Sequence, residues 1–102
     1  MRRGEIWWAM VGKKTRPIVL LSRDSHLKTR KMILASPITS RIRNVESEVA
    51  LGPEDRLSKR CVVNAATVDL IPKTRLIRHI WTLSMAKQDA LDAALRFSLG
   101  LD

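Results

Sequence analysis

The chain has 102 residues, which is room for one domain with one core, so we expect residues 1–102 to form a single domain. Hydrophobic residues make up 45% and charged residues 28%, a balance that excludes a disordered chain. The sequence contains no apolar run near the roughly 18 residues of a membrane span, and no apolar leader follows its start. The one cysteine, Cys61, excludes an internal disulfide. These features predict a cytoplasmic protein with no membrane partner.

The net charge of +9 comes from the first two-fifths of the chain. Residues 1–43 carry eleven Lys and Arg against two acidic residues, whereas residues 44–102 carry eight of each sign. This excess predicts a polyanionic partner, because Lys and Arg that meet phosphates release condensed counterions. A basic surface that serves only solubility is the other interpretation. An anionic membrane surface is disfavoured, since the basic residues are interleaved with strand-like runs and not arranged on one amphipathic helix.

Short apolar and β-branched runs predict a mainly β protein. The expected strands are residues 4–11, 18–22, 31–36, 47–51, 60–70 and 76–83. Gly, Pro, polar and basic segments predict the connections between them. These are a turn at 12–15, a loop at 23–31, a connector at 41–45, a turn at 52–55 and a single helical turn at 72–74.

The end of the chain predicts one helix over residues 85–99. Ser84 suits the N-cap and Gly100 suits the C-terminal stop. Apolar residues at helical spacing predict one buried face, formed by Leu91, Ala94, Leu95 and Leu99. Short strands followed by a packing helix predict a small β-barrel.

Four segments, in order along almost the whole chain, carry a resemblance to a known family. They are Arg3-Gly4-Glu5-Ile6-Trp7-Trp8, Arg16-Pro17-Ile18-Val19-Leu20, Pro37-Ile38-Thr39-Ser40, and the tail from Leu83-Ser84 through Leu99-Gly100-Leu101. Together they resemble the MazF/PemK toxins of type II toxin–antitoxin systems.

The resemblance implies an SH3-like β-barrel of the MazF/PemK/CcdB type with a C-terminal α-helix, usually as a homodimer. It implies a sequence-specific endoribonuclease, an mRNA interferase that cleaves single-stranded RNA without a metal or cofactor. It also implies a cognate antitoxin protein as partner. Arg16 and Thr39 match the positions that the family uses for catalysis.

Cleavage of RNA without a metal uses the 2′-hydroxyl of the substrate as nucleophile and leaves a 2′,3′-cyclic phosphate and a 5′-hydroxyl. The guanidinium of Arg16 suits stabilisation of the crowded phosphorane, because its fork can meet two phosphoryl oxygens at once. The hydroxyl of Thr39 suits positioning of the same phosphate. Without the resemblance, Arg16 is a surface arginine before a strand and Thr39 a strand-end hydroxyl that bonds its own backbone. The sequence indicates no general base.

Basic and polar residues near these two positions predict a groove for one RNA strand. The expected RNA-binding residues are Lys13, Lys14, Ser40, Arg41, Arg43 and Asn64.

The other reactive or aromatic residues fit structural roles better. His26 lies in a polar segment and His79 in a strand, and neither has ligands at the spacing of a zinc site. Cys61 has apolar neighbours, which favours a core position. Alternation places Trp7 and Trp8 on opposite faces of a sheet, so at least one belongs to the core.

Two other functions fit the same fold. One is a DNA gyrase poison of the CcdB type, although such proteins rely on a terminal tryptophan and this chain ends Gly100-Leu101-Asp102. The other is a nucleic-acid-binding module without catalysis. It is kept open by Ala66 and Thr67, which stand where relatives commonly carry an acidic residue and an amide.

Overall fold

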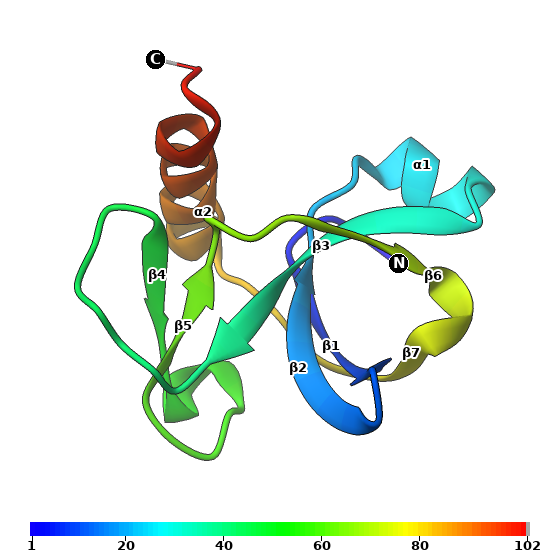
Figure 1. The fold of residues 1–102 in the computed structure, drawn as a ribbon, viewed down its shortest axis with the longest axis horizontal. Helices are drawn as coiled ribbons and strands as arrows, with labels where there is room; N and C mark the ends of the chain where they lie inside the picture. Colours follow the sequence, from blue (N-terminus) through cyan, green and yellow to red (C-terminus); the bar gives the residue numbers. More distant parts are fainter. Residues whose placement is uncertain (102) are drawn as a thin grey trace.

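The computed structural model describes residues 1–101, which fold into a curled antiparallel sheet with two helices (Figure 1). The strands are β1 (Glu5–Val11), β2 (Lys14–Leu20), β3 (Met32–Thr39), β4 (Glu48–Leu51), β5 (Cys61–Asn64), β6 (Asp69–Pro72) and β7 (Leu76–Thr82). The helices are α1 (Asp24–Thr29) and α2 (Met85–Leu99), with 3-10 turns η1 (Pro53–Asp55) and η2 (Lys73–Arg75). The expected small β-barrel with a C-terminal helix is confirmed.

Strand β3 is the centre of the sheet because it pairs with three neighbours. The strand order is β4-β5-β3-β2-β1-β7, and β6 also pairs with β3. Along β3, the first half pairs with β6, the middle with β2 and the end with β5. A strand that changes partners in this way bends the sheet, and the bend gives the molecule its half-barrel shape (Figure 1).

The apolar faces of the sheet enclose two clusters of buried side chains. The first lies under α2 and includes Ile6, Val19 and Leu51, with Leu91 of the helix fully buried among them. The second lies under α1 and is centred on Leu20, Leu27 and Ile33. Strands β1, β2 and β3 contribute side chains to both clusters. These three strands are therefore packed on both faces of the sheet.

Helix α2 begins and ends where the sequence predicts. The hydroxyl of Ser84 accepts the backbone N–H of Lys87 at 3.2 Å, and Gly100 takes a left-handed conformation with φ of +68°. Leu91 and Ala94 are buried as expected, but Leu99 is 57% exposed, so the prediction for Leu99 is wrong. The last turn of the helix extends past the edge of the sheet that it covers (Figure 1).

Four of the expected segments differ from the structure by more than one residue or in kind. Strand β2 begins at Lys14, inside the expected turn, because it continues the hairpin with β1 to Val11. Strand β3 runs through Pro37 to Thr39. The expected loop at 23–31 contains α1, and the expected strand at 60–70 is two strands separated by a turn. Within residues 1–101, no helix has the length and apolar character needed to cross a membrane.

Candidate functional site

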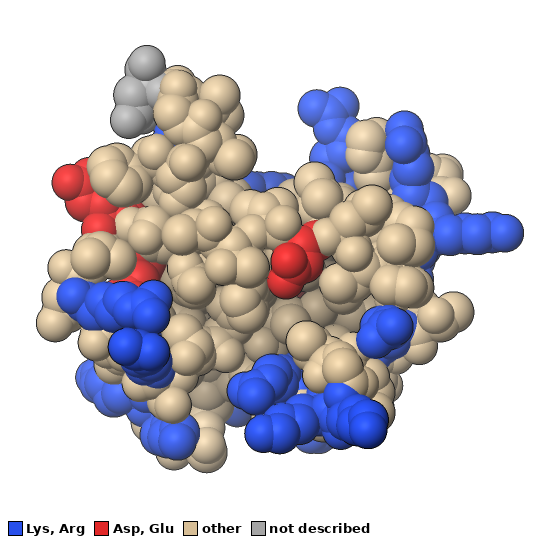
Figure 2. Space-filling model, in the orientation of Figure 1, with Lys and Arg blue, Asp and Glu red and all other residues tan. Residues whose placement is uncertain are grey.

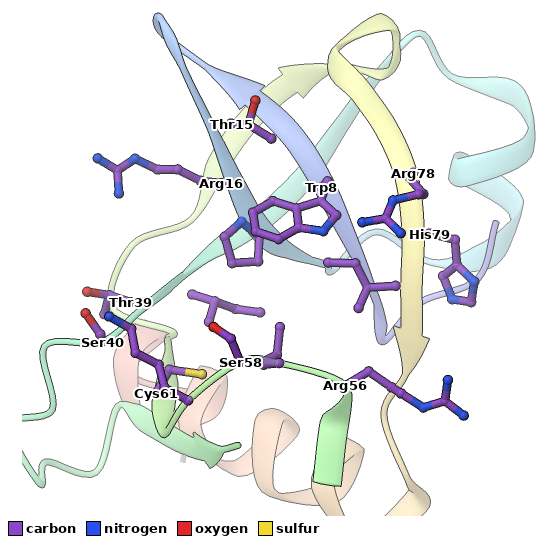
Figure 3. Close-up of a pocket in the computed structure, with 15 residues that line it drawn as sticks. Trp8, Thr15, Arg16, Thr39, Ser40, Arg56, Ser58, Cys61, Arg78 and His79 are labelled. Atoms are coloured by element: carbon purple, nitrogen blue, oxygen red, sulfur yellow. The ribbon is translucent and has the colours of Figure 1, made fainter. Parts of the chain in front are cut away.

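An open cleft of about 740 Å³ lies where β2 and β3 separate, and the loop from Arg56 to Cys61 forms its far wall (Figure 3). Among the described residues 1–101, its lining includes four Lys and Arg residues and no Asp or Glu. The lining residues are Trp8, Thr15, Arg16, Pro17, Ile38, Thr39, Ser40, Arg56, Leu57, Ser58, Lys59, Cys61, Arg78, His79 and Ile80. The cleft is therefore cationic, with an apolar floor.

Pro17 explains why the two strands separate at this point. The backbone N–H of Leu21 donates to Leu34 of β3, so strand alternation directs the backbone of position 17 toward β3 as well. Proline has no N–H to donate, and the ladder between β2 and β3 ends at the pair Ile18–Pro37. Past that pair, Ile38 turns to pair with Val63 of β5. The cleft occupies the space that this divergence opens.

Arg16 and Thr39 lie on the two sides of this divergence. Continuing the register of the pair Ile18–Pro37 by two residues would set Arg16 directly opposite Thr39. Both residues line the cleft. In Figure 3, Arg16 lies on the side of the cleft where Thr39 and Ser40 lie, and its guanidinium points away from the cleft centre. The two residues that the resemblance singled out thus come from neighbouring strand ends and border one cavity.

The contacts of these two side chains leave groups available to a ligand. Arg16 is exposed, and within residues 1–101 its guanidinium makes no ion pair or hydrogen bond. The hydroxyl oxygen of Thr39 accepts the backbone N–H of Arg41 at 3.2 Å. This bond fixes the oxygen while the hydroxyl hydrogen can still be donated, for example to a phosphate oxygen.

On the side of the cleft formed by β1 and β7, an arginine lies beside a tryptophan. Trp8 of β1 pairs with Arg78 of β7, so the two side chains share a face of the sheet. Figure 3 shows the Arg78 guanidinium pointing toward the Trp8 ring inside the cleft. An exposed arginine beside a half-buried aromatic ring is suited to stack a nucleobase and to meet its phosphate. Trp7 and Trp8 fall on opposite faces as expected, and Trp7 packs against the cluster under α1.

An ion-pair network attaches the loop that forms the far wall to α2. Asp55, at the end of η1, is 3% exposed and accepts bonds from the backbone N–H of Gly52 and from the ammonium group of Lys87. Lys87 also lies 3.6 Å from a carboxylate oxygen of Glu54. Next in the chain, Arg56 has a left-handed φ of 62° and stacks on Trp81, with 4.5 Å from its guanidinium carbon to the ring centroid. Helix α2 therefore positions this wall from behind.

The structure brings only one of the six expected RNA-binding residues into the cleft. Ser40 lines it. Lys13 and Lys14 lie exposed at the β1–β2 hairpin, and Arg41 and Arg43 lie exposed in the connector after β3. Asn64 lies outside the cleft, where its amide caps a turn by accepting the N–H of Ala66 at 3.1 Å and donating to the hydroxyl of Thr67 at 3.2 Å. RNA binding by these residues stays a prediction.

Five cationic or aromatic cleft residues were not predicted as site residues, namely Trp8, Arg56, Lys59, Arg78 and His79. Arg78 follows β1 by about seventy positions in the sequence, and only the pairing of β1 with β7 places it beside Trp8. The signal available in the sequence was strand alternation, because Arg78 and His79 are neighbours in a strand and their side chains must point to opposite faces of the sheet. The positions of Arg56 and Lys59 depend on the contacts of η1 with α2, which leave no local pattern.

His79 and Cys61 have the structural surroundings that their sequence context suggests, whereas His26 lies in helix α1 and not in the expected loop. The His79 ring lies 5.7 Å from the Trp7 ring and turns away from the cleft centre, with its Nε2 3.2 Å from the Thr82 hydroxyl (Figure 3). Cys61 is buried in the cluster under α2, and burial raises the pKa of its thiol, which keeps it protonated near neutral pH. Among residues 1–101, no three His, Cys, Asp or Glu side chains gather where they could hold a metal ion.

Comparison with known proteins shows similarity over nearly the whole chain. Residues 2–99 match the family described as "PemK-like, MazF-like toxin of type II toxin-antitoxin system". The chain is 34% identical over 101 residues to "Probable endoribonuclease MazF5" of Mycobacterium tuberculosis, covering 95% of this chain and 91% of that protein. It is equally identical to "Probable endoribonuclease MazF2" of the same species, covering 98% and 99%.

Solved structures share the fold closely. The "Mycobacterium tuberculosis toxin MazF-mt6" superposes with a TM-score of 0.90 at 28% identity, covering 96% of this chain and 98% of that one. An "endoribonuclease in complex with its cognate antitoxin" from a mycobacterial species has a TM-score of 0.90 at 24% identity, covering 100% and 97%. Because the second structure shares only 24% of its sequence with this chain, its similarity shows the fold alone.

Proposed function

The chain belongs to the PemK-like, MazF-like toxins of type II toxin–antitoxin systems, and we propose that it is an endoribonuclease toxin whose active site is the cleft between β2 and β3. The relatives that share a third of its sequence over nearly its whole length are named endoribonucleases. The substrate is single-stranded RNA, including mRNA, which the toxin cleaves sequence-specifically. A cognate antitoxin neutralises the toxin, and one solved relative is itself an endoribonuclease in complex with its cognate antitoxin.

One observation carries the assignment of the site: Arg16 and Thr39 border the same cavity, on two strands that part between them. A planar guanidinium that is free to swing inward and a hydroxyl fixed through Arg41 can meet one phosphodiester from two sides. No carboxylate of the part of the chain that the structure describes lines the cavity to repel the phosphate. The cleft therefore favours a polyanion over a neutral or cationic substrate.

The reaction is a transesterification within the RNA. The 2′-oxygen attacks phosphorus, a bond forms between them, and the bond from phosphorus to the 5′-oxygen breaks. The 2′-hydroxyl gives up one proton and the leaving 5′-oxygen takes one up, so the step consumes no net proton. Arg16 stabilises the charge of the phosphorane and Thr39 holds a non-bridging oxygen in place. The products are a 2′,3′-cyclic phosphate and a 5′-hydroxyl.

The opposite wall holds the bases beside the scissile bond. Trp8 supplies a flat surface for stacking and Arg78 supplies a charge at its edge. Ser40 and the exposed cations Lys13, Lys14, Arg41 and Arg43 bind the backbone on either side of the cut, and Asn64 completes the set of RNA contacts. The toxin acts in the cytoplasm as a homodimer.

Purified protein incubated with a long RNA in EDTA tests this function. We expect discrete cuts, and ligation-based mapping of the ends should find 5′-hydroxyl groups. Pre-incubation with the antitoxin should prevent the cuts. Intact RNA that binds with strong salt dependence would instead indicate a binding module without catalysis. Gyrase-dependent DNA breaks would indicate the poison of the CcdB type. Either result would overturn the proposal.

A further inference from the structure

A second concentration of positive charge lies far from the cleft, around α1 and the turn η2. Figure 2 shows Lys and Arg side chains projecting over α1 at the upper right, in the orientation of Figure 1. We define this α1 basic face by Arg23, Lys28, Arg30, Lys31 and Lys73. The first four are exposed and Lys73 is half-buried. The cleft is elsewhere, since none of the five lines it.

Carboxylates do not balance this charge. Among residues 1–101, the ion pairs are those of Arg3 with Asp92, and those of Arg60 and Lys87 with η1. All of them involve α2 or η1. The nearest acidic residue in sequence, Asp24, accepts the backbone N–H of Arg3 at 2.8 Å. The guanidinium of Arg30 donates to Nε2 of His26 at 3.5 Å, so its side-chain partner here is an imidazole and not a carboxylate. A face that accumulates cations without partners is suited to attract a polyanion.

The face contains a groove with fixed walls. A hollow of about 560 Å³ is lined by Thr29, Arg30, Lys31, Met32, Pro72, Lys73 and Thr74. The backbone N–H of Lys73 donates to Lys31 at 2.9 Å, and its ammonium group bonds the carbonyl of Leu27 in α1. Because Lys73 fastens α1 to η2, the two exposed cations at the groove, Arg30 and Lys31, project from a rigid base.

The composition of the face favours a nucleic acid over a protein as its ligand. From position 23 to 31, the buried Leu27 is the one apolar side chain, and the rest are charged or polar. Protein interfaces take most of their energy from buried aromatic and aliphatic anchors, and beside this segment the groove adds two apolar residues, Met32 and Pro72, and no aromatic one. A phosphate backbone needs only cations and hydrogen-bond donors.

We infer that the α1 basic face is a second RNA-binding surface, which holds the phosphate backbone of a substrate beyond the stretch that lies in the cleft. The inference rests on the proposed function for the identity of the polyanion. The surface makes no contact with the scissile bond, so it raises the affinity for long RNA and leaves the chemical step unchanged. The molecule measures 32 Å along its longest axis, so a strand of a few tens of nucleotides reaches both surfaces.

Binding of an RNA that cannot be cut tests the inference without depending on activity. The probe is a 30-nucleotide 2′-O-methyl oligouridine, whose blocked 2′-oxygen prevents cleavage, and a five-nucleotide version is the short reference. The variant Arg30→Gln/Lys31→Gln removes the two exposed cations of the groove. Its control, Arg30→Lys/Lys31→Arg, keeps both charges, and Arg96→Gln removes one charge on α2. Thermal unfolding verifies that all variants fold.

For the 30-mer, we expect the charge-removing variant to bind about tenfold more weakly at 0.1 M salt. Its log–log salt dependence should be shallower by about 1.4, since each phosphate that a cation neutralises on a single strand contributes about 0.7 to the slope. With the five-nucleotide probe, we expect the charge-removing variant and the parent protein to bind with equal affinity. With the 30-mer, we expect the charge-keeping control and Arg96→Gln to bind as tightly as the parent protein.

Equal binding of the 30-mer by the charge-removing variant and the parent would overturn the inference, as would a loss of antitoxin binding with RNA binding intact. If the parent protein binds the 30-mer through this face yet cuts no RNA, the proposed function fails and the second surface stands.

Discussion

At the residue scale, the site depends on a proline that prevents pairing. Pro17 removes the N–H that would have joined β2 to Ile38, and the gap that follows becomes the cleft. The same residue precedes β2's buried half and follows Arg16, so it fixes where the guanidinium leaves the strand. The Arg-Pro pair is thus one structural unit, in which the proline opens the cavity and the arginine borders it.

Arg16→Ala should abolish cleavage while the protein stays folded. Removing a group that stabilises charge in the transition state costs about 10²–10³-fold in kcat, and an exposed side chain without bonding partners contributes little to stability. Gel assays of RNA cleavage and thermal unfolding check the two parts. Arg16→Lys is the matched control, and because it keeps the charge but lacks the fork we expect it to recover only part of the rate. Full activity of the alanine variant would refute the assignment of the site.

At the scale of elements, the sequence predicts those whose signal is local. Helix α2 has its cap at Ser84, its stop at Gly100 and an apolar stripe through Leu91, so both ends could be predicted. Helix α1 has six residues with one buried side chain, Leu27, and is held by Lys73 from 46 positions away, so no local pattern reveals it. The split between β5 and β6 depends on side-chain bonds at a turn, which strand periodicity does not reveal.

The site follows the same division. Arg16 and Thr39 could be proposed as site residues because each stands in a short motif that resembles one of the MazF/PemK family, where the matching position is used for catalysis. Arg78 and Arg56 enter the cleft through pairing of distant strands and through the contact of η1 with α2. Asn64 illustrates the opposite case, since it lies outside the cleft with its amide bonded within a turn, and its proposed RNA contact rests on its chemistry and not on a place in the cavity. Side-chain chemistry alone does not say which groups share a cavity.

The contact between η1 and α2 is expected to contribute to the stability of the fold. Lys87→Met leaves the carboxylate of Asp55 buried with one remaining donor, the N–H of Gly52, so we expect unfolding to become easier by about 2 kcal/mol. Chemical denaturation measures this difference. Lys28→Met, at an exposed position of α1, is the control and should change stability by less than about 0.5 kcal/mol. Equal midpoints for the two variants would show that the pair contributes nothing beyond an exposed ion pair.

At the scale of the whole molecule, charge is sorted by function. The ion pairs gather at α2 and η1, where they hold the fold together, while the cleft and the α1 basic face keep their cations free of carboxylates within residues 1–101. The net charge of +9 is therefore not spread evenly, and cations without carboxylate partners collect in the cleft and on the α1 basic face. Such an arrangement attracts RNA before any base is recognised.

This sorting predicts how cleavage responds to salt. Between 50 and 200 mM NaCl, kcat/KM on a long RNA should fall about a hundredfold, because salt screens the attraction between each cation and its phosphate, whereas kcat at saturating RNA should change by less than about threefold. Initial rates across RNA concentrations separate the two constants, and thermal unfolding in the same buffers serves as the control for folding. A matched fall in kcat would mean that salt reaches the chemical step itself. A kcat/KM that does not change with salt would contradict an electrostatic origin of RNA capture, because the free cations of the cleft and of the α1 basic face would then contribute nothing to it.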